Sequence, residues 1–495
     1  MRAVAALAAA LALLSVRSAQ AVSPAVGSFA TSDPLLGAIW KSSVRTATDM
    51  VAPGPLATDA EGRPCAIALK KVLLDGARRD RCPYVGDQAV TGMTLLVSHP
   101  EDAAVLRDMI EWYAGHQHDD GSIPASPYGG GAVTNFDYNA YWVEDVYDYV
   151  LYTGDLGLAR DVWPSLVRLL DGWYPAQTGP DGLLVDGLGR LDYGNIPRAG
   201  TTVAYYNAGY VRALREASSI AGWIGHTARA AAWNARVGPV AAAFGRAFWD
   251  ASAGAYRDAT TGPVVHPQDG NVFAVLAGLT SLSRARTALD YLSAHDWQPY
   301  GATIADNDTW HSRAWGSHAS LRVYPFIGYF ELLARYQSGL DSSAVALIRR
   351  EWGYMLNNGP RSTMWETIGP GGSPPTDQTP SFDHGWSSGA APALTSYALG
   401  VMPASPGFAS YRAQPHPADL QWARGVVPTP HGPIRLSWAY GPATLSATVV
   451  APVPGRITLP ADGTARLDGR PIPRQQLQTS VEVAAGRHTL VVATS

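Results

Sequence analysis

The stretches TVAYYNAGYVRALREASSIAG (residues 202–222) and HTARAAAWNARVGPVAAAFGRAFW (residues 226–249) decide the fold class that the sequence predicts. In both of them, apolar residues recur with the period of an α-helix, and only residues 223–225, which end in Gly225, separate them. The two stretches therefore predict two successive helices.

Segments with the same period recur from about Asp33 to about Gly400, between loops that contain Gly, Pro, Asp or Asn. The predicted helices are 33–49, 86–99, 101–117, 139–153, 157–173, 202–222, 226–249, 270–279, 281–294, 314–337, 341–356 and 386–399. Taken in sequential pairs they make hairpins, and six hairpins that close into a ring form an all-α (α/α)6 barrel. Loops such as NFDYNAYW (135–142) and RLDYGNIP (190–197) are polar and aromatic. Because long ordered loops usually carry function, we expect them to meet at one mouth of the barrel.

The pattern changes after Pro403, where short alternating runs replace the helical period. The runs at 434–438, 444–450 and 489–492 alternate apolar and polar residues, and turn sequences such as HGP and LDGR separate the runs. We therefore predict a small C-terminal antiparallel β-sandwich over 405–495, which follows a helical catalytic domain over 22–404.

The first 21 residues have the features of a secretory signal peptide, namely Arg2, an apolar run and the sequence Ala19-Gln20-Ala21 as a cleavage site. The alternative is an uncleaved anchor. No later stretch is apolar for long enough to span a bilayer. We therefore expect a secreted, extracellular protein.

The charge and the composition exclude several classes of function. A net charge of −4 and an isoelectric point near 6.3 argue against nucleic acid or an anionic membrane as the main partner. Because no group of Cys and His residues has the spacing of a zinc site and no phosphate-binding loop occurs, the sequence predicts no metal and no cofactor. Cys65 and Cys82 are the only cysteines, and in an oxidising compartment they either pair or remain free. Asn307-Asp308-Thr309 is a candidate glycosylation site.

The aromatic content points toward carbohydrate. The chain has 16 Trp and 23 Tyr, and the C–H face of a pyranose packs well on an aromatic ring. A helical barrel without a cofactor motif favours hydrolysis by two carboxyl groups, one that protonates the leaving oxygen and one that activates water or attacks directly. Such chemistry requires carboxylates that separate loops bring to one mouth of the barrel.

Three stretches supply such carboxylates. DGARRDRCPYVGD (75–87) places three aspartates among three arginines, which is either a substrate site or a salt-bridge network. Glu366 follows Trp365 and precedes a loop rich in Gly and Pro, although a lone Glu is often only a solvated surface residue. Asp383-His384 precedes a helix of small residues. Asp383 is either a helix cap or part of a site. His384 either binds a sugar hydroxyl or orients Glu366.

The order and spacing of these elements resemble those of the α-L-rhamnosidases in the six-hairpin glycosidase superfamily, over nearly all of the chain that follows the leader. The matching residues are Asp75, Arg79, Asp80, Gly86 and Asp87 in an early element, Asp137 and Asp192-Tyr193 in the middle, and Trp365-Glu366 and Asp383-His384 late in the chain. Tyr84 stands where the family often has Trp. The resemblance implies inverting enzymes with an (α/α)6 barrel followed by a β-sandwich, without the N-terminal β-domains of larger relatives.

The resemblance also implies roles for these residues. Glu366 is the expected base that activates water. The family's acid is a Glu directly after Arg-Asp, which is missing here, so the expected acid is Asp80, with Asp87 as the second choice. The other predicted substrate-binding residues are Asp75, Arg79, Tyr84, Asp137, Trp142, Asp192, Tyr193, Trp365, His384 and Trp386.

These features predict an exo-acting glycoside hydrolase that removes terminal α-L-rhamnose from an oligosaccharide, a polysaccharide or another glycoside. Three alternatives remain at this point. The first is an exo-glycosidase for another sugar on the same barrel. The second is a polysaccharide lyase that uses His384 or Tyr84 beside a uronate. The third is a sugar-binding protein that has lost its catalytic acid.

Overall fold

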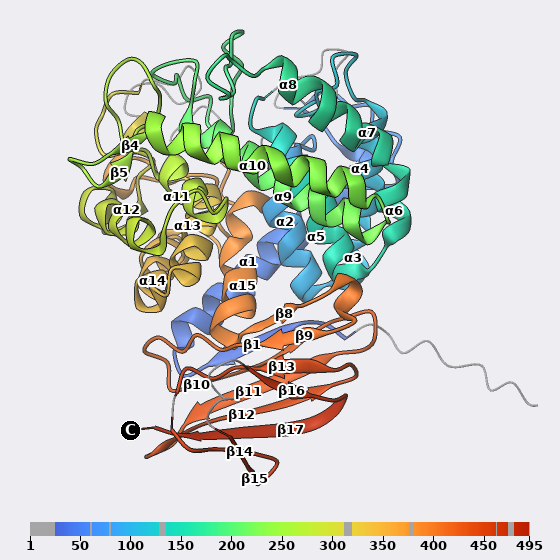
Figure 1. Cartoon of the computed structure of the whole chain (residues 1–495), viewed down its shortest axis with the longest axis vertical. Helices are drawn as coiled ribbons and strands as arrows, with labels where there is room; N and C mark the ends of the chain where they lie inside the picture. Colours follow the sequence, from blue (N-terminus) through green and yellow to red (C-terminus); the bar gives the residue numbers. More distant parts are fainter. Residues whose placement is uncertain are drawn as a thin grey trace, which may run out of the picture.

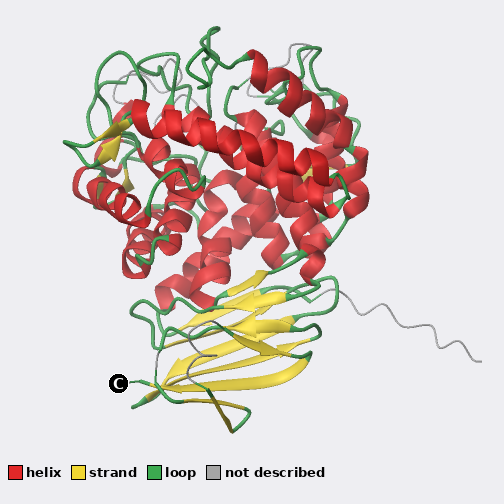
Figure 2. Ribbon diagram, in the orientation of Figure 1, coloured by secondary structure: helices red, strands yellow, loops and turns green. Residues whose placement is uncertain are grey.

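The computed structural model describes residues 25–59, 62–78, 81–127, 135–310, 319–375, 381–461, 463–473 and 480–494. Helices form the upper part of the molecule and β-strands form the lower part (Figures 1 and 2). The predicted signal peptide and two predicted site residues, Arg79 and Asp80, lie outside the described residues.

The helices agree with most of the predicted ranges. They are α1 (Pro34–Asp49), α2 (Val85–Ser98), α3 (Pro100–Ala103), α4 (Val105–Gly115), α5 (Tyr138–Thr153), α6 (Leu156–Asp161), α7 (Trp163–Arg168), α8 (Tyr174–Ala176), α9 (Ala204–Trp223), α10 (Thr227–Ala247), α11 (Gln268–Leu276), α12 (Leu282–His295), α13 (Pro325–Gln337), α14 (Asp341–Asn358) and α15 (Ala390–Ala393). Short helical turns η5 (Gly385–Gly389) and η6 (Leu394–Leu399) flank α15. None of the described helices combines the length and the apolarity that a membrane crossing requires.

Local chemistry sets several helix ends. The carboxylate of Asp33 accepts a hydrogen bond of 2.8 Å from the N–H of Leu35, and Pro34 occupies the first turn of α1. Gly154 ends α5 in the left-handed conformation. The helix predicted from residue 314 begins only at Pro325, because proline fits the first turn of a helix and breaks its interior.

Helices α9 and α10, which match the predicted ranges 202–222 and 226–249, pack on each other. The other contacts follow a regular order. Helix α2 packs on α5, α5 on α9, α9 on α11, α11 on α13, α13 on η5, and η5 on α2, so the contacts return to their starting helix. Four of the helices in this cycle also contact a further helix each. Helix α4 contacts α5, α10 contacts α9, α12 contacts α11 and α14 contacts α13.

The strands of the lower part form two main sheets (Figure 1). The large sheet has the strand order β1 (Ser28–Thr31), β10 (Trp422–Val427), β11 (Ile434–Tyr440), β12 (Thr444–Ala451), β17 (Gly486–Ala493), β14 (Ala465–Leu467) and β15 (Arg470–Ile472). The small sheet has the order β16 (Val481–Val483), β13 (Gly455–Ile457), β9 (Tyr411–Ala413) and β8 (Val401–Pro403). Short two-stranded ribbons join β2 (Val51–Pro53) to β3 (Lys71–Leu73), β4 (Trp249–Asp250) to β5 (Ala255–Tyr256), and β6 (Trp297–Gln298) to β7 (Gly301–Ala302).

The antiparallel sheet content is confirmed, and two details differ from the prediction. Strands β1 and β8, which the predicted boundary assigns to the helical domain, belong to the sheets: β1 pairs with β10, with Phe29 opposite Gly425, and β8 pairs with β9. Four residues are too few to reveal an alternating pattern in a sequence. The second difference is that β9 and β13 run parallel to each other.

Buried side chains join the sheets to the helices. Trp438 of β11 is buried and donates its indole N–H to the carbonyl of Ala398, at 2.9 Å. Strand β1 contacts α1, and β8 contacts η6, so the first strand and the strand after the last helix both hold the sheets against the helical part. Helix α1 and the segment that follows α15 are thereby fixed at the start and the end of the helical region.

Candidate active site

Two segments from distant parts of the sequence, the early charged stretch and the connection between α14 and η5, meet at the candidate site. The N–H of Gly385 donates to the carbonyl of Asp75 at 3.1 Å, which joins the late loop to the early charged stretch. The N–H of Glu366 donates to the carbonyl of Ser381 at 3.0 Å, which joins the Trp-Glu element to the same late loop. These backbone bonds fix the relative positions of the carboxylates that the sequence suggested.

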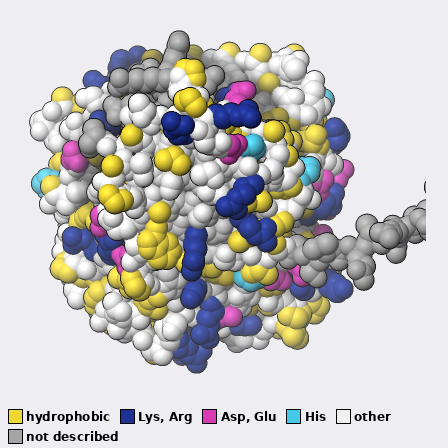
Figure 3. Space-filling view, turned by 90° about the horizontal axis from the view of Figure 1, so that it is seen from below, with side chains coloured by type: hydrophobic (Ala, Val, Ile, Leu, Met, Phe, Trp, Pro, Cys, Tyr) yellow, Lys and Arg dark blue, Asp and Glu magenta, His cyan; other side chains and the backbone are white. Residues whose placement is uncertain are grey.

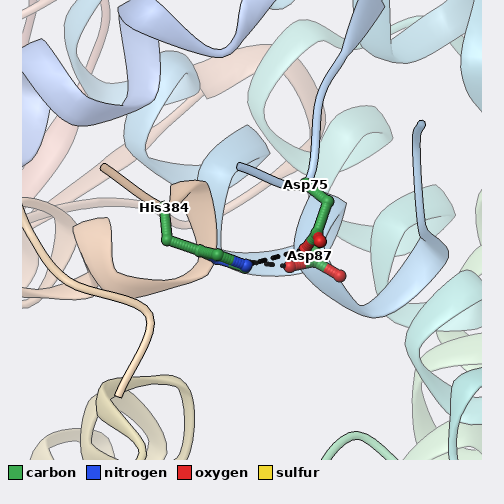
Figure 4. A group of neighbouring side chains, drawn as sticks. All are labelled: Asp75, Asp87 and His384. Atoms are coloured by element: carbon green, nitrogen blue, oxygen red, sulfur yellow. Dashed lines mark ion pairs between the residues drawn. The ribbon is translucent and has the colours of Figure 1, made fainter. Parts of the chain in front are cut away.

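The imidazole of His384 points toward the carboxylates of Asp75 and Asp87 (Figure 4). Its Nε2 lies 2.9 Å from Oδ1 of Asp75 and 3.8 Å from Oε1 of Glu366, and its Nδ1 lies 3.7 Å from Oδ1 of Asp87. All four side chains are buried, with Glu366 only 1% exposed and His384 fully covered. An imidazole among carboxylates can hold them in place and exchange protons and hydrogen bonds with them.

Asp87 lies in the first turn of α2. The partial positive charge of a helix N-terminus stabilises an ionised carboxylate at this position. Gly86 precedes it, and a Cβ atom there would lie 2.5 Å from the ring of Tyr138. Glycine is therefore required for the ring of Tyr138 to pack against the start of α2.

Tyr138 is a candidate site residue that the sequence interpretation missed, although it directly follows Asp137. Burial, together with the negative charges of Asp87 and Asp137, raises the pKa of the Tyr138 hydroxyl well above its ordinary value. The hydroxyl therefore remains protonated and can donate a hydrogen bond. Its position next to a predicted site aspartate was the available signal.

An aromatic row extends from His384 across the site. The ring of Trp386 lies 4.6 Å from that of His384 and stacks on Phe326 at 5.3 Å, and Phe326 lies 5.5 Å from Tyr193. Trp386 also donates its indole N–H to the carbonyl of Glu366 at 2.8 Å. The row therefore holds the backbone of Glu366 and connects it to Tyr193. Phe326 was not among the predicted residues.

A buried arginine organises the middle loop. Arg198 is 5% exposed in its side chain and contacts Asp192 at 2.8 Å, Asp258 at 3.0 Å and Asp269 at 2.6 Å. The hydroxyl of Tyr193 donates to Asp269 at 3.1 Å. Burial raises the pKa of Asp258 to about 6, although Arg198 acts to lower it. Asp192 therefore anchors the loop that carries Tyr193.

Asp137 supports the same loop. Its Oδ2 accepts hydrogen bonds from the N–H of Tyr193 at 3.2 Å and from the hydroxyl of Tyr205 at 3.1 Å. Burial, followed by the nearby charge of Asp192, raises the pKa of Asp137 well above its ordinary value. The structure thus joins Asp137 to the Asp192-Tyr193 element by direct contact.

Two predicted aromatic residues point elsewhere. Trp142 was expected in the aromatic wall, but it is buried between α4 and α5 and donates its indole N–H to the carbonyl of Ile110 at 3.2 Å. Trp365 packs against Tyr354 and Phe382, with ring centroids 6.3 and 5.5 Å apart. Neither indole belongs to the row formed by Trp386, Phe326 and Tyr193.

The remaining predicted residues are placed as follows. Cys65 and Cys82 form a disulfide with Cα atoms 5.9 Å apart, and the carbonyl of Cys82 accepts a hydrogen bond from the N–H of Asp75 at 3.3 Å. The disulfide therefore supports the early loop.

Tyr84 lies partly buried just before α2. The amide nitrogen of Asn307 donates to the carboxylate of Asp306 at 2.9 Å, and its glycosylation stays a prediction.

The same group offers donor atoms for a cation. One ligand atom each from Asp75, Asp87 and His384 lies within 4.8 Å of the others. Carboxylates and imidazoles bind several divalent metals. The group can therefore bind either a metal ion or the hydroxyls of a sugar. Removal of metal ions with a chelator distinguishes these two functions.

Comparison with known proteins defines the class of the two parts of the chain. The family model of the bacterial alpha-L-rhamnosidase six-hairpin glycosidase domain matches residues 65–300, and that of the bacterial alpha-L-rhamnosidase C-terminal domain matches residues 400–470. The chain is thus a six-hairpin glycosidase domain followed by a rhamnosidase C-terminal domain. It belongs to the family of bacterial alpha-L-rhamnosidases, and the resemblance read from its sequence is confirmed. No curated protein matches the sequence.

Solved structures share this fold. A GH78 family rhamnosidase of Bacillus sp. GL1 is 24% identical, with a TM-score of 0.72, over 88% of this chain and 43% of that one. The alpha-L-rhamnosidase from Dictyoglumus thermophilum is 15% identical, with a TM-score of 0.71, over 95% and 51%. The Streptomyces avermitilis alpha-L-rhamnosidase complexed with L-rhamnose is 18% identical, with a TM-score of 0.67, over 95% and 42%. The chain therefore spans about half or less of the length of these relatives.

Proposed function

We propose that this chain is a secreted, exo-acting α-L-rhamnosidase that hydrolyses terminal α-L-rhamnosides without a metal and with inversion. The observation that carries the proposal is that the buried Glu366 lies 3.8 Å from the imidazole of His384. The same imidazole also faces Asp75 and Asp87. Family membership supports the reaction class. The L-rhamnose in the Streptomyces avermitilis relative supports the sugar.

We further propose that the helices form an (α/α)6 barrel and that the two sheets form a sandwich beside it. The cyclic order of contacts, from α2 through α5, α9, α11 and α13 to η5 and back to α2, supports the barrel. In such a barrel the candidate active site lies at the mouth where the loops before α2, before α5 and before η5 meet.

The proposed chemistry needs one proton acceptor and one proton donor. Glu366 accepts a proton from a water molecule, whose oxygen attacks the anomeric carbon as the bond to the leaving oxygen breaks. A carboxylic acid transfers its proton to that leaving oxygen, so the proton count balances. A single displacement inverts the anomeric configuration and requires carboxyl groups about 6.5–9.5 Å apart.

Asp80 is the proposed acid, and Asp87 is proposed to accept hydrogen bonds from sugar hydroxyls. The position of Asp87 in the first turn of α2 favours its ionised form, which suits an acceptor better than a proton donor. Asp75 and His384, 2.9 Å apart, are proposed to bind further hydroxyls on the same side of the sugar. Tyr138 is proposed to donate to the substrate.

The arrangement argues against the lyase alternative. A lyase needs its base beside the carboxylate of a uronate. Here Asp75, Asp87 and Glu366 surround His384, and these carboxylates would repel that of a uronate. A neutral sugar has no such penalty, and a deoxy-sugar also offers a methyl group for Trp386 or Phe326.

The direct test is hydrolysis of p-nitrophenyl α-L-rhamnoside by the purified chain, with and without EDTA. We expect nitrophenol to be released equally in both samples. We also expect β-L-rhamnose to be the first anomer seen by NMR, because a single displacement inverts the α-linkage. The α-anomer appearing first would contradict inversion, and loss of activity in EDTA would contradict metal independence. Release of nitrophenol only from another aryl glycoside would contradict the assignment of rhamnose as the sugar.

Substrates with good and poor leaving groups identify the acid. Asp80→Asn should reduce kcat/KM on methyl α-L-rhamnoside by about 10²-fold or more, but much less on p-nitrophenyl α-L-rhamnoside, whose leaving group needs little protonation. Asp87→Asn, the matched control, should impair both substrates by the same factor. The opposite pattern would assign the proton donor to Asp87.

A further inference from the structure

A second cleft lies where the helical part meets the small sheet. It has a volume of about 960 Å³ and is lined by side chains of α5 and by Trp223 at the end of α9 on one side, and by residues of β9, β13 and β16 on the other. Ligand sites typically have volumes of about 300–1,000 Å³ and often lie between domains. None of the residues of the candidate active site lines this cleft.

An aromatic platform forms the helical wall of the cleft. The rings of Tyr147 and Trp223 stack at 5.2 Å with an angle of 23° between their planes, and both side chains are only partly buried. Leu151, one helical turn after Tyr147, extends the same surface. Burial raises the pKa of the Tyr147 hydroxyl to about 12, so the hydroxyl remains a hydrogen-bond donor. Such a half-exposed aromatic surface fits the C–H face of a pyranose.

A row of charged side chains forms the opposite wall. Arg412 of β9 lies beside Arg456 of β13, and Arg456 lies beside Glu482 of β16, in the register of the small sheet. All three side chains point to the exposed face of that sheet. Arg456 pairs with Glu482 at 2.9 Å, whereas Arg412 forms no ion pair with a carboxylate in the described part of the chain.

This arrangement leaves an unbalanced positive charge in the cleft. Like charges on neighbouring strands, about 5 Å apart, destabilise a sheet. A ligand carboxylate between the two guanidinium groups would remove that cost and form charge-assisted hydrogen bonds. Seen from below, Lys and Arg side chains also form a band across the underside of the molecule (Figure 3).

We propose that this cleft is a second saccharide-binding site that takes an acidic oligosaccharide. The uronate carboxylate binds Arg412 and Arg456, and a neighbouring pyranose ring packs on Tyr147 and Trp223. The site holds an acidic polysaccharide on the protein while the candidate active site acts on terminal residues. The inference is independent of the proposed hydrolysis, because binding is measured without turnover.

The test is affinity electrophoresis of the full chain in native gels that contain polygalacturonate or a neutral galactan. We expect polygalacturonate to retard the parent protein and neutral galactan to leave its mobility unchanged. Arg412→Ala and Trp223→Ala should each weaken retention by about tenfold or more, because each removes one half of the site. Arg435→Ala, the matched control, removes an exposed arginine of the large sheet and should retain full binding.

Three results would overturn the proposal. They are equal retention of the parent and Trp223→Ala proteins, retention by neutral galactan alone, or a loss in Arg435→Ala as large as that in Arg412→Ala. The last result would mean that surface charge binds the polymer without a defined site. Hydrolysis of p-nitrophenyl α-L-rhamnoside should be unchanged in the Arg412 and Trp223 variants, which separates a failure of this site from a failure of the proposed function.

Discussion

Glu366→Gln is expected to reduce kcat for α-L-rhamnoside hydrolysis by about 10²–10⁴-fold, the range typical for loss of a general base. Glutamine has nearly the same shape as glutamate but cannot accept a proton from water. The side chain is 1% exposed, and its backbone is held by Ser381 and Trp386, so the amide should occupy the same place. The measurement is steady-state hydrolysis of p-nitrophenyl α-L-rhamnoside.

The fold of this variant serves as the internal control. We expect its melting temperature to stay within about 3 °C of the parent value, because the change conserves volume. Glu101→Gln, at an exposed position of α3, should keep full activity. Retained turnover in Glu366→Gln would assign the base to another residue, whereas a large drop in melting temperature would give Glu366 a structural role instead.

Arg198→Leu is expected to destabilise the protein by about 3–5 kcal/mol, the cost of leaving buried charges without their partner. Asp192, Asp258 and Asp269 would then lie close together in the interior with no cation among them. The effect should extend to the active site, because Tyr193 bonds to Asp269 and packs on Phe326. The measurement is chemical unfolding combined with the rhamnoside assay.

The loss should depend on pH with a definite sign. The pKa of Asp258 is already raised to about 6 with Arg198 present. Without Arg198 the pKa of Asp258 in the folded protein should rise further above its unfolded value. Stability is then lost as pH rises through the folded value, so the deficit should be larger at about pH 8 than at about pH 5.

Two further variants test whether charge is the cause. Arg198→Lys keeps the positive charge but not the planar fork of donors, so it should lose less stability than Arg198→Leu. Arg435→Leu makes the same change at an exposed position of β11 and should shift stability by about 0.5 kcal/mol or less. A deficit in Arg198→Leu that is small, or the same at both pH values, would contradict this account of the cluster.

Most helices and the three longer strands β11, β12 and β17 could be predicted because their signals are local. The helices over 202–222 and 226–249 follow from their period, which is visible in the sequence. Strand β1 was missed because four residues show too little alternation, and its pairing with β10 depends on a distant part of the chain. The late start of α13 at Pro325 was missed for a local reason, since the proline was visible.

The candidate site was predictable in its chemistry and less so in its geometry. Glu366, His384 and the early aspartates were named from residue types and from a family resemblance, and the structure brings the described ones together. Trp142 was misplaced because its helix is buried on several faces, and the sequence does not show which face turns to the site. Arg198 was missed because one arginine in a loop carries no signal of its contacts with Asp258 and Asp269, which lie 60 and 71 residues further along the chain.

The sequence by itself determined where most helices and the longer C-terminal strands form and which side chains can do acid–base chemistry, because these properties depend on residues close together in the chain. Only the tertiary structure decided that an imidazole from the end of the helical region lies between Asp75 and Asp87 from its beginning. It also decided that Arg412 and Arg456 face Tyr147 and Trp223 across a cleft. Such contacts depend on how helices and sheets are rotated and packed against one another, and local periodicity does not encode that relation.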